Sequence, residues 1–88
     1  MENRIVVIVT YPNNSEKTFG LKPEMNMGVF INYVRKNSDM SLSSTEGLYL
    51  FVKNTIPSNS KTLGEIHNEF KDDDGILRCV TIKENTFG

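Results

Sequence analysis

The sequence predicts a small α+β domain in which a four-stranded mixed sheet packs on one main helix, with a second, short helix beside it. Two apolar runs, at residues 5–9 and 47–52, are rich in β-branched, aromatic and leucine residues and are too brief for helices. Between them, at residues 27–36, apolar residues recur at helical spacing. The 88 residues suit a single domain, expected over residues 1–83, followed by a flexible tail at residues 84–88.

Composition and charge argue against several classes of function. The 10 basic and 11 acidic residues give a formal net charge of −1 without a basic block, so neither nucleic acid nor an anionic membrane is expected as the main partner. The single Cys79 excludes an internal disulfide. The first four residues precede only five apolar ones, which is neither a signal peptide nor a spanning helix. We therefore expect a cytoplasmic protein.

The first half of the chain is predicted to form a hairpin. Residues 5–9 form a wholly apolar strand, residues 11–15 have the Pro and Asn content of a turn, and residues 16–21 return as a more polar strand.

The main helix follows this hairpin. Asn26 is placed to cap a helix from Met27 to about Lys36. Arg35 and Lys36 suit the negative pole at its C-terminus. Residues 37–46 are polar, rich in serine and without periodicity, and are predicted to be a loop. The apolar face of the helix consists of Met27, Phe30, Ile31 and Val34.

The second half adds two strands and the short helix. Residues 47–52 form a strand that is apolar on both faces. Thr62 and Glu65 have the spacing of a capping box before the short helix. Residues 71–75 form a tight turn into a last strand at residues 76–83. The apolar face of the short helix consists of Leu63, Ile66 and Phe70.

A hairpin, a crossover helix and a parallel return strand make a mixed sheet wrapped on one helix, which is the β-grasp arrangement of ubiquitin-like folds. The alternation of side chains along a strand assigns each apolar residue of the two central runs to one face. Those expected to face the helix are Ile5, Val7, Val9, Leu48, Leu50 and Val52. Those expected to face away are Val6, Ile8, Tyr49 and Phe51.

The second apolar face predicts an interface, because a sheet covered by one helix layer should alternate apolar and polar residues. Contiguous exposed apolar surface on a small soluble domain usually marks a site of interaction. We expect an additional segment, a partner or a second copy of the chain to cover it. The alternative is that long polar side chains and loops shield this face.

The last five residues suggest that the protein is itself a substrate. Because glycine has no Cβ, an extended chain ending in Gly88 can pass through a narrow channel and offer its carboxylate to a nucleophile. The alternative is that the tail is an ordinary disordered terminus.

Several stretches resemble the autophagy-related protein 8 family, the GABARAP-type ubiquitin-like modifiers. The most specific are LFVKNTIP at residues 50–57, KDDDGIL at residues 71–77 and ENTFG at residues 84–88. Weaker resemblance extends over residues 4–8, 19–21 and 28–30, with Arg35 and Lys36, and so covers nearly the whole chain.

The resemblance implies a modifier whose terminal glycine is adenylated by an activating enzyme, passed between cysteines as a thioester, and joined to the amine of phosphatidylethanolamine. Gly88 matches the conjugated glycine, and Thr86 and Phe87 match the part of the tail that the enzymes recognise. The implied partners are the activating and conjugating enzymes and the lipid. The implied location is the cytoplasm, and the autophagosomal or vacuolar membrane when the protein is lipidated.

The family also recruits receptors through short peptides with an aromatic residue and, three positions later, an aliphatic one. Such a peptide adds a strand to the open edge of the second strand. Arg4, Lys17 and Arg35 are expected to attract acidic residues that flank the motif. By match to the family, one pocket consists of Val6, Ile8, Gly20 and Ile76. The other consists of Phe19, Leu21, Met25, Phe30 and Tyr33, of which Leu21 and Phe30 are equally explained as ordinary core residues.

The sequence departs from the family in three places. Family members usually carry two helices before the first strand, whereas Arg4 lies almost at the start of this sequence, so we expect the first pocket to lack a wall. The turn around Pro12 is short. Gly20 and Lys22 replace bulkier or apolar residues in the groove, which predicts weakened or altered peptide binding.

Two other functions fit the same fold. A modifier of the autophagy-related protein 12 type is joined to a protein lysine, but it usually has Trp before its last glycine, so Phe87 favours the lipid-linked type. A ubiquitin-like binding module that is never conjugated would have no need of a free glycine carboxylate.

An enzyme is not expected. His67 lies on a short amphipathic helix and Cys79 on a strand, and no third group at a readable spacing makes them a nucleophile and base pair. Residues 72–74 are three aspartates without the spacing of a calcium loop and are predicted to be a solvated turn. We therefore expect no metal and no cofactor.

Overall fold

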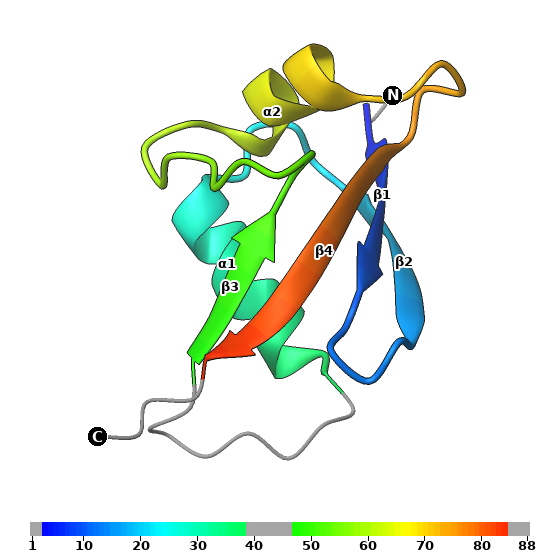
Figure 1. Cartoon of the computed structure of the whole chain (residues 1–88). Helices are drawn as coiled ribbons and strands as arrows, with labels where there is room; N and C mark the ends of the chain where they lie inside the picture. Colours follow the sequence, from blue (N-terminus) through cyan, green and yellow to red (C-terminus); the bar gives the residue numbers. More distant parts are fainter. Residues whose placement is uncertain (1–2, 39–46, 85–88) are drawn as a thin grey trace.

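Four strands form one mixed sheet, and α1 crosses one of its faces (Figure 1). The computed structural model describes residues 3–38 and 47–84. Strand β1 pairs antiparallel with β2 and parallel with β4, and β3 pairs antiparallel with β4, in the order β2-β1-β4-β3. This topology confirms the predicted α+β, β-grasp fold. The elements are β1 (Ile5–Thr10), β2 (Glu16–Leu21), α1 (Met27–Lys36), β3 (Gly47–Phe51), α2 (Leu63–Phe70) and β4 (Leu77–Glu84).

The turn between β1 and β2 is closed by backbone hydrogen bonds. Tyr11 N–H donates to the Ser15 carbonyl at 2.8 Å, and Asn14 N–H donates to the Tyr11 carbonyl at 2.8 Å. Asn14 has a φ of +68°, a left-handed conformation that Asn adopts more readily than most residues. The predicted hairpin is confirmed, with β1 one residue longer than expected.

Helix α1 has the predicted bounds because both of its ends are satisfied locally. Asn26 Oδ1 accepts a hydrogen bond from Gly28 N–H at 2.8 Å, which makes Asn26 the N-cap. At the other end the Lys17 ammonium donates to the Asn37 carbonyl, so a cation from β2 lies at the negative pole of the helix. The loop predicted at residues 37–46 lies outside the described residues beyond Ser38.

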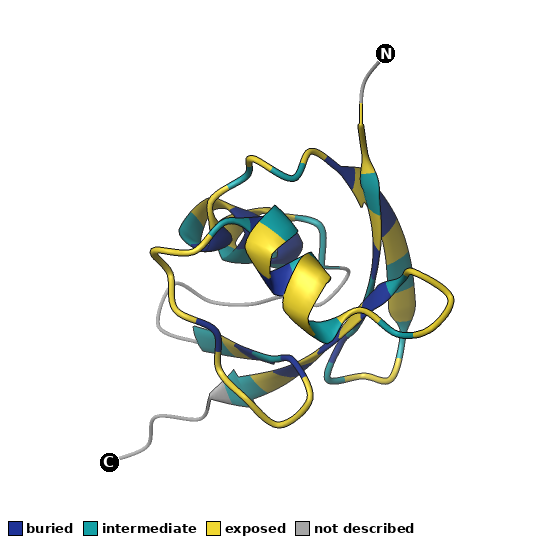
Figure 2. Cartoon of the chain, turned by 90° about the horizontal axis from the view of Figure 1, so that it is seen from above, coloured by how far each residue is buried: buried dark blue, intermediate teal, exposed yellow. Residues whose placement is uncertain are grey.

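The core lies between the sheet and the two helices, and buried residues alternate with exposed ones along the strands (Figure 2). Of the residues predicted to face α1, Ile5 and Leu48 are half-buried and the other four are buried. Two polar groups in the interior are paired: Tyr11 Oη donates to the Val34 carbonyl at 2.8 Å, and Thr81 Oγ1 donates to the Thr10 carbonyl at 2.9 Å. The buried apolar residues are Val7, Val9, Tyr11, Phe19, Leu21, Met27, Phe30, Val34, Leu50, Val52, Leu63, Ile66, Leu77 and Cys79.

Helix α2 begins with the predicted capping box. Thr62 Oγ1 accepts from Glu65 N–H at 3.2 Å, and Glu65 Oε1 accepts from Thr62 N–H at 2.9 Å. Gly64 lets the helix approach the segment before α1, because a Cβ on Gly64 would lie 2.8 Å from Pro23 Cβ. Gly64 N–H also donates to the Pro23 carbonyl at 2.8 Å.

Strand β3 ends one residue earlier than predicted. Val52 turns back to pair with Thr55 through hydrogen bonds of 2.8 and 3.0 Å. The two residues between them, Lys53 and Asn54, have φ values of +48° and +67°, as a tight two-residue turn requires. This turn places the Lys53 side chain beside the turn that precedes β4, as described below.

Candidate functional site

Strand β2 lies at an edge of the sheet, and its backbone alternates between groups that bond β1 and groups that point away. The hydrogen bond from Tyr11 to Ser15 makes that pair a bonded one. Every second pair along the register is bonded as well, and Phe19 belongs to one of them. The intervening residues Thr18 and Gly20 therefore direct their N–H and C=O groups to the open edge. An extended peptide can add there as a further strand.

The four residues predicted for the first pocket lie together on the outer face, by which we mean the face of the sheet opposite α1. Val6 pairs with Gly20 across β1 and β2, and the parallel register of β1 and β4 places Ile76 on the other side of Val6. Ile8 is the next outward residue of β1. Val6 is 41% exposed, and a Cβ on Gly20 would meet nothing within 4 Å. A side chain can reach this area, and its role in peptide binding stays a prediction.

The five residues predicted for the second pocket are mostly core residues. Phe30 is fully buried and Leu21 nearly so, as expected of ordinary core residues, and Phe19 is nearly buried as well. Tyr33 is partly exposed and covers Phe19 with an edge-to-face contact, at 5.4 Å between ring centroids. Met25 is partly buried against the core. Tyr33 and Met25 are therefore the members of this set that offer most surface to a ligand.

A hollow of about 450 Å³ opens next to these residues, where β2 ends and α1 begins. We call it the β2-end hollow. Its apolar part consists of Leu21, Met25 and Val29, and Val29 is 56% exposed. The sequence did not indicate Val29, because it lies outside the apolar face of α1. The polar residues of the β2-end hollow are Arg4, Lys22, Glu24 and Asn26.

The three basic residues expected to attract acidic ligands have different surroundings. Arg4 Nη1–H donates to the Gly20 carbonyl at 3.0 Å, which is one of the groups that point to the open edge. Lys17 donates to the Asn37 carbonyl at the end of α1. Arg35 lies half-buried in the last turn of α1. Of these contacts, the one made by Arg4 lies on the edge where a peptide would add.

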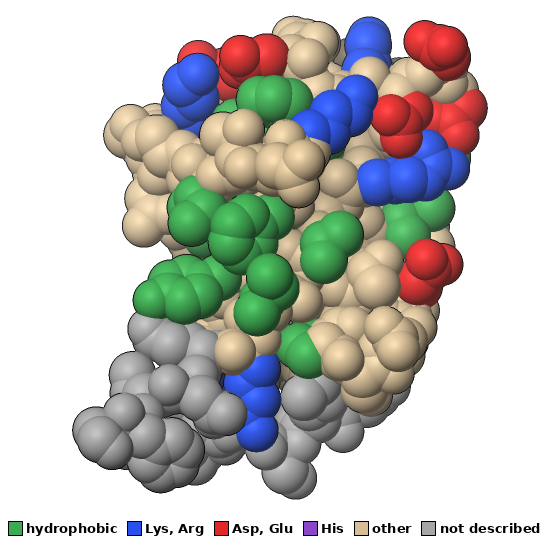
Figure 3. Space-filling view, viewed as in Figure 1, with side chains coloured by type: hydrophobic (Ala, Val, Ile, Leu, Met, Phe, Trp, Pro, Cys, Tyr) green, Lys and Arg blue, Asp and Glu red, His purple; other side chains and the backbone are tan. Residues whose placement is uncertain are grey.

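The outer face carries a broad apolar patch over β3 and β4 (Figure 3). Tyr49 is exposed and Phe51 half-exposed, as predicted for residues that face away from α1. Val80 and Ile82 of β4, each 50% exposed, extend the patch because they pair with Phe51 and Tyr49. Val80 and Ile82 are apolar and two residues apart in the last strand, so the sequence could have indicated that the patch extends onto this strand. Part of the patch is a hollow of about 300 Å³ lined by Phe51, Lys53, Asn54, Val80 and Ile82.

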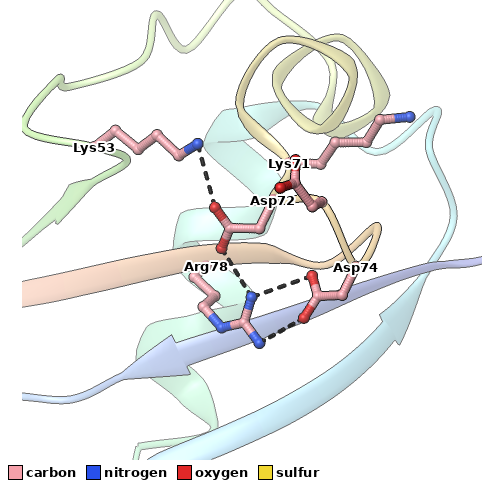
Figure 4. Close-up of a pocket in the computed structure, with 6 residues that line it drawn as sticks. Lys53, Lys71, Asp72, Asp74 and Arg78 are labelled. Atoms are coloured by element: carbon pink, nitrogen blue, oxygen red, sulfur yellow. Dashed lines mark hydrogen bonds and ion pairs between the residues drawn. The ribbon is translucent and has the colours of Figure 1, made fainter.

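The acidic turn before β4 is tied to its neighbours by ion pairs (Figure 4). Arg78 donates to Asp72 Oδ2 at 2.8 Å and to Asp74 Oδ2 at 2.9 Å. Lys53 Nζ lies 3.3 Å from Asp72 Oδ1. The hydrogen bonds from Arg78 hold the pKa values of both aspartates below their ordinary range, and the aspartates raise the pKa of Arg78. The turn was predicted to be simply solvated. Two of its aspartates, Asp72 and Asp74, also connect it to Arg78 and Lys53.

The two residues with nucleophile or base chemistry have structural surroundings. Cys79 is buried in the core, and this burial raises the pKa of its thiol to about 12. His67 Nε2 lies 2.8 Å from the Gly75 carbonyl, within hydrogen-bond distance. Within residues 3–38 and 47–84, no cluster of His, Cys, Asp and Glu has the grouping of a metal site, and no helix is long and apolar enough to cross a membrane. Thr86, Phe87 and Gly88 lie outside the described residues.

Comparisons with known proteins agree with this geometry. The family described as "autophagy protein Atg8 ubiquitin like" matches residues 1–88. Autophagy-related protein 8c of Arabidopsis thaliana is 36% identical over 92 aligned residues, which cover 98% of this chain and 76% of the relative.

Two solved structures share the fold and show modest sequence identity. The crystal structure of Trypanosoma brucei Atg8 superposes with a TM-score of 0.79 at 25% identity, covering 97% of this chain and 77% of that one. Plasmodium falciparum Atg8, in complex with an Atg3 peptide from the same organism, superposes with a TM-score of 0.75 at 26% identity, covering 97% of this chain and 80% of that one. The chain belongs to the Atg8 family of ubiquitin-like autophagy proteins.

Proposed function

We propose that the protein is a ubiquitin-like modifier that is conjugated through Gly88 to phosphatidylethanolamine and recruits receptors that carry an aromatic-x-x-aliphatic motif. The observation that carries the proposal is the Atg8 family match, which extends through Gly88. The complex of the Plasmodium falciparum relative with an Atg3 peptide supports a conjugating enzyme as a partner.

The proposed chemistry takes place at the carboxylate of Gly88. ATP adenylates this carboxylate and releases pyrophosphate, and the thiolate of the activating enzyme then displaces AMP to form a thioester. The acyl group passes to a cysteine of the conjugating enzyme. The lipid amine finally attacks the thioester carbonyl, so an amide forms and the enzyme thiol is released. Glycine suits this series of reactions because it places no Cβ beside the carbonyl carbon that is attacked.

In this proposal the chain is a substrate and an adaptor, not an enzyme. The burial of Cys79 and its raised pKa disfavour the thiolate that nucleophilic catalysis needs. The contact between His67 and the Gly75 carbonyl gives the imidazole a structural task.

Receptor binding is proposed at the open edge of β2. The outward N–H and C=O groups of Thr18 and Gly20 would bond the backbone of the peptide. The exposed area around Val6 would accept the aromatic side chain, and the β2-end hollow would accept the aliphatic one. Backbone bonds supply generic affinity in this mode, and the side-chain sites supply selectivity.

Lipidation would divide the protein between the cytoplasm and the autophagosomal or vacuolar membrane. The described residues contain no membrane-spanning helix, so the two acyl chains of the conjugated lipid would supply the anchor.

The direct test is a reconstituted reaction with cognate activating and conjugating enzymes, ATP and liposomes that contain phosphatidylethanolamine. We expect the intact mass to rise by one lipid, and the variant that lacks Gly88 to stay unmodified. A thioester followed by transfer to a protein lysine would favour the autophagy-related protein 12 type. If no thioester forms with the activating enzyme, the proposal of a modifier fails and a binding module remains.

A further inference from the structure

We propose that Arg4 determines which peptides the β2 edge accepts: it occupies the Gly20 carbonyl and yields it to peptides that bring a carboxylate to its guanidinium. This inference rests on the proposed binding of receptors at β2.

The Gly20 carbonyl is a group that strand addition at this edge requires. The pairing of β1 with β2 directs it away from β1, where an incoming strand would supply an N–H donor. In the structure the donor is instead Arg4 Nη1, at 3.0 Å. Although a carbonyl oxygen has two lone pairs, a guanidinium 3.0 Å from this outward oxygen would hinder the backbone of a new strand at the same place. A peptide backbone and Arg4 therefore compete for this position.

The absence of a side chain on Gly20 makes Arg4 the group that controls access. A Cβ on Gly20 would meet nothing within 4 Å, so the described residues leave the outer side of Gly20 open. Thr18, the neighbouring residue with outward backbone groups, has a side chain of its own on the outer face. Arg4 thus controls access to the edge of β2 at Gly20, where no side chain covers the backbone.

Displacing Arg4 should be easier for an acidic peptide than for a neutral one. A neutral peptide replaces the charge-assisted hydrogen bond from Arg4 to Gly20 by a neutral one, and the guanidinium loses this contact. A peptide carboxylate within reach gives the guanidinium a stronger partner and compensates for the lost contact. Because the preference is a difference between two affinities, Arg4 can create it by penalising neutral peptides as well as by attracting acidic ones.

The position of Arg4 also indicates where the carboxylate would lie. Arg4 lines the β2-end hollow together with Lys22 and Glu24, so the rim carries two cations and one anion. The apolar part of the hollow lies next to this rim. The geometry therefore favours a peptide whose carboxylate lies close to the aliphatic side chain that enters the hollow. Glu24 would compete with the peptide for the released guanidinium.

Lys22 provides a matched control. It lines the same hollow and carries the same charge, but the outward carbonyl of Gly20 accepts from Arg4. Lys22→Ala therefore removes one positive charge at this end of β2 and leaves the Gly20 carbonyl bonded to Arg4. Both substituted residues are exposed, and thermal unfolding would verify that the variants fold.

The experiment measures Kd by calorimetry for two synthetic peptides that share an aromatic-x-x-aliphatic core. One carries glutamates beside the core and the other carries glutamines at the same positions. We expect the wild type to prefer the glutamate peptide. Arg4→Ala should bind the glutamine peptide about two- to tenfold more tightly than the wild type does, and the glutamate peptide more weakly. Lys22→Ala should show no gain for the glutamine peptide.

The decisive result is that Arg4→Ala binds the neutral glutamine peptide more tightly than the wild type does. Removing a residue that only attracts acidic ligands cannot produce this increase in affinity. If the wild type binds the glutamate peptide and Arg4→Ala gains nothing for the glutamine peptide, receptor binding stands and the inference about Arg4 is overturned. An equal gain in Lys22→Ala would also overturn it, since the effect would then follow charge alone. If neither peptide binds the wild type or Arg4→Ala, both the proposed receptor site and the role of Arg4 are wrong.

Discussion

On β1, Val7 and Val9 point to α1 and are fully buried, whereas Val6 points to the outer face and keeps 41% of its surface exposed. The strand is apolar on both sides, so the difference comes from what covers each side. On the inner face α1 supplies Phe30 and Val34, which belong to the same buried cluster as the inward valines of β1. On the outer face the described residues leave the apolar side chains and the open edge of β2 available for partners. The same kind of residue therefore stabilises the fold on one face and is free to serve recognition on the other.

The largest expected effect is on the inner face. Phe30→Ala removes a fully buried ring and should lower the free energy of unfolding by about 3–5 kcal/mol, measured by urea denaturation. Ile82→Ala on the outer face is the matched control, because Ile82 is half exposed, and it should cost about 1 kcal/mol or less. Similar losses for both variants would show that the outer face is as well packed as the inner one.

A pair of glycines tests the same contrast through added rather than removed atoms. Gly64→Ala places a Cβ 2.8 Å from Pro23 Cβ and 3.1 Å from the Pro23 carbonyl oxygen, so the backbone must shift. We expect a loss of about 1–3 kcal/mol in the same denaturation assay. Gly20→Ala meets no atom within 4 Å and should change stability by about 0.5 kcal/mol or less. A large loss at Gly20 would contradict the open outer side of β2.

The ion pairs around Arg78 predict a dependence of stability on pH. The pKa values of Asp72 and Asp74 are lowered in the folded state, chiefly by hydrogen bonds from Arg78. Their contribution is therefore fully present above the ordinary value of 3.8 and is lost as the pH falls through the lowered values. Arg78→Met should lower the Tm at pH 7 and narrow the difference in Tm between pH 7 and pH 2. If the difference in Tm between pH 7 and pH 2 is the same in the variant and the wild type, these exposed ion pairs contribute nothing measurable to stability.

The smallest change in stability is expected for polar substitutions in the apolar patch of the outer face. Val80→Ser with Ile82→Ser should leave the fold intact, because both side chains are half exposed. If the patch is where copies of the chain associate, the double variant should sediment as a smaller species than the wild type at the same concentration. Equal sedimentation at high concentration would exclude self-association through these two residues.

Much of the fold could be predicted because its signals are local. The Asn26 cap and the spacing of the apolar residues defined α1 with the bounds that the structure has. Thr62 and Glu65, three residues apart, defined the start of α2 in the same way. The third strand ends one residue earlier than predicted, because the chain turns back from Val52 to Thr55 with positive φ values at Lys53 and Asn54, neither of which is glycine.

The candidate site could be predicted only in part, because it depends on contacts between residues that are distant in the sequence. The outward side chains of the first and third strands followed from alternation alone. The contact between Arg4 and Gly20 required the register of β1 and β2, and the pair of Lys53 and Asp72 required the approach of two separate turns. The second pocket was predicted from family resemblance, and Phe30 of that set is in the core because α1 turns it toward the sheet.

The most direct test of a receptor site on β2 is amide hydrogen exchange, residue by residue, with and without a peptide that carries the aromatic-x-x-aliphatic motif and glutamates. Strand addition predicts that the N–H groups of Thr18 and Gly20 gain protection, while Phe19, already bonded to β1, changes little. Uniform protection along β2, or protection confined to Tyr49 and Phe51 on the outer face, would contradict the proposed site.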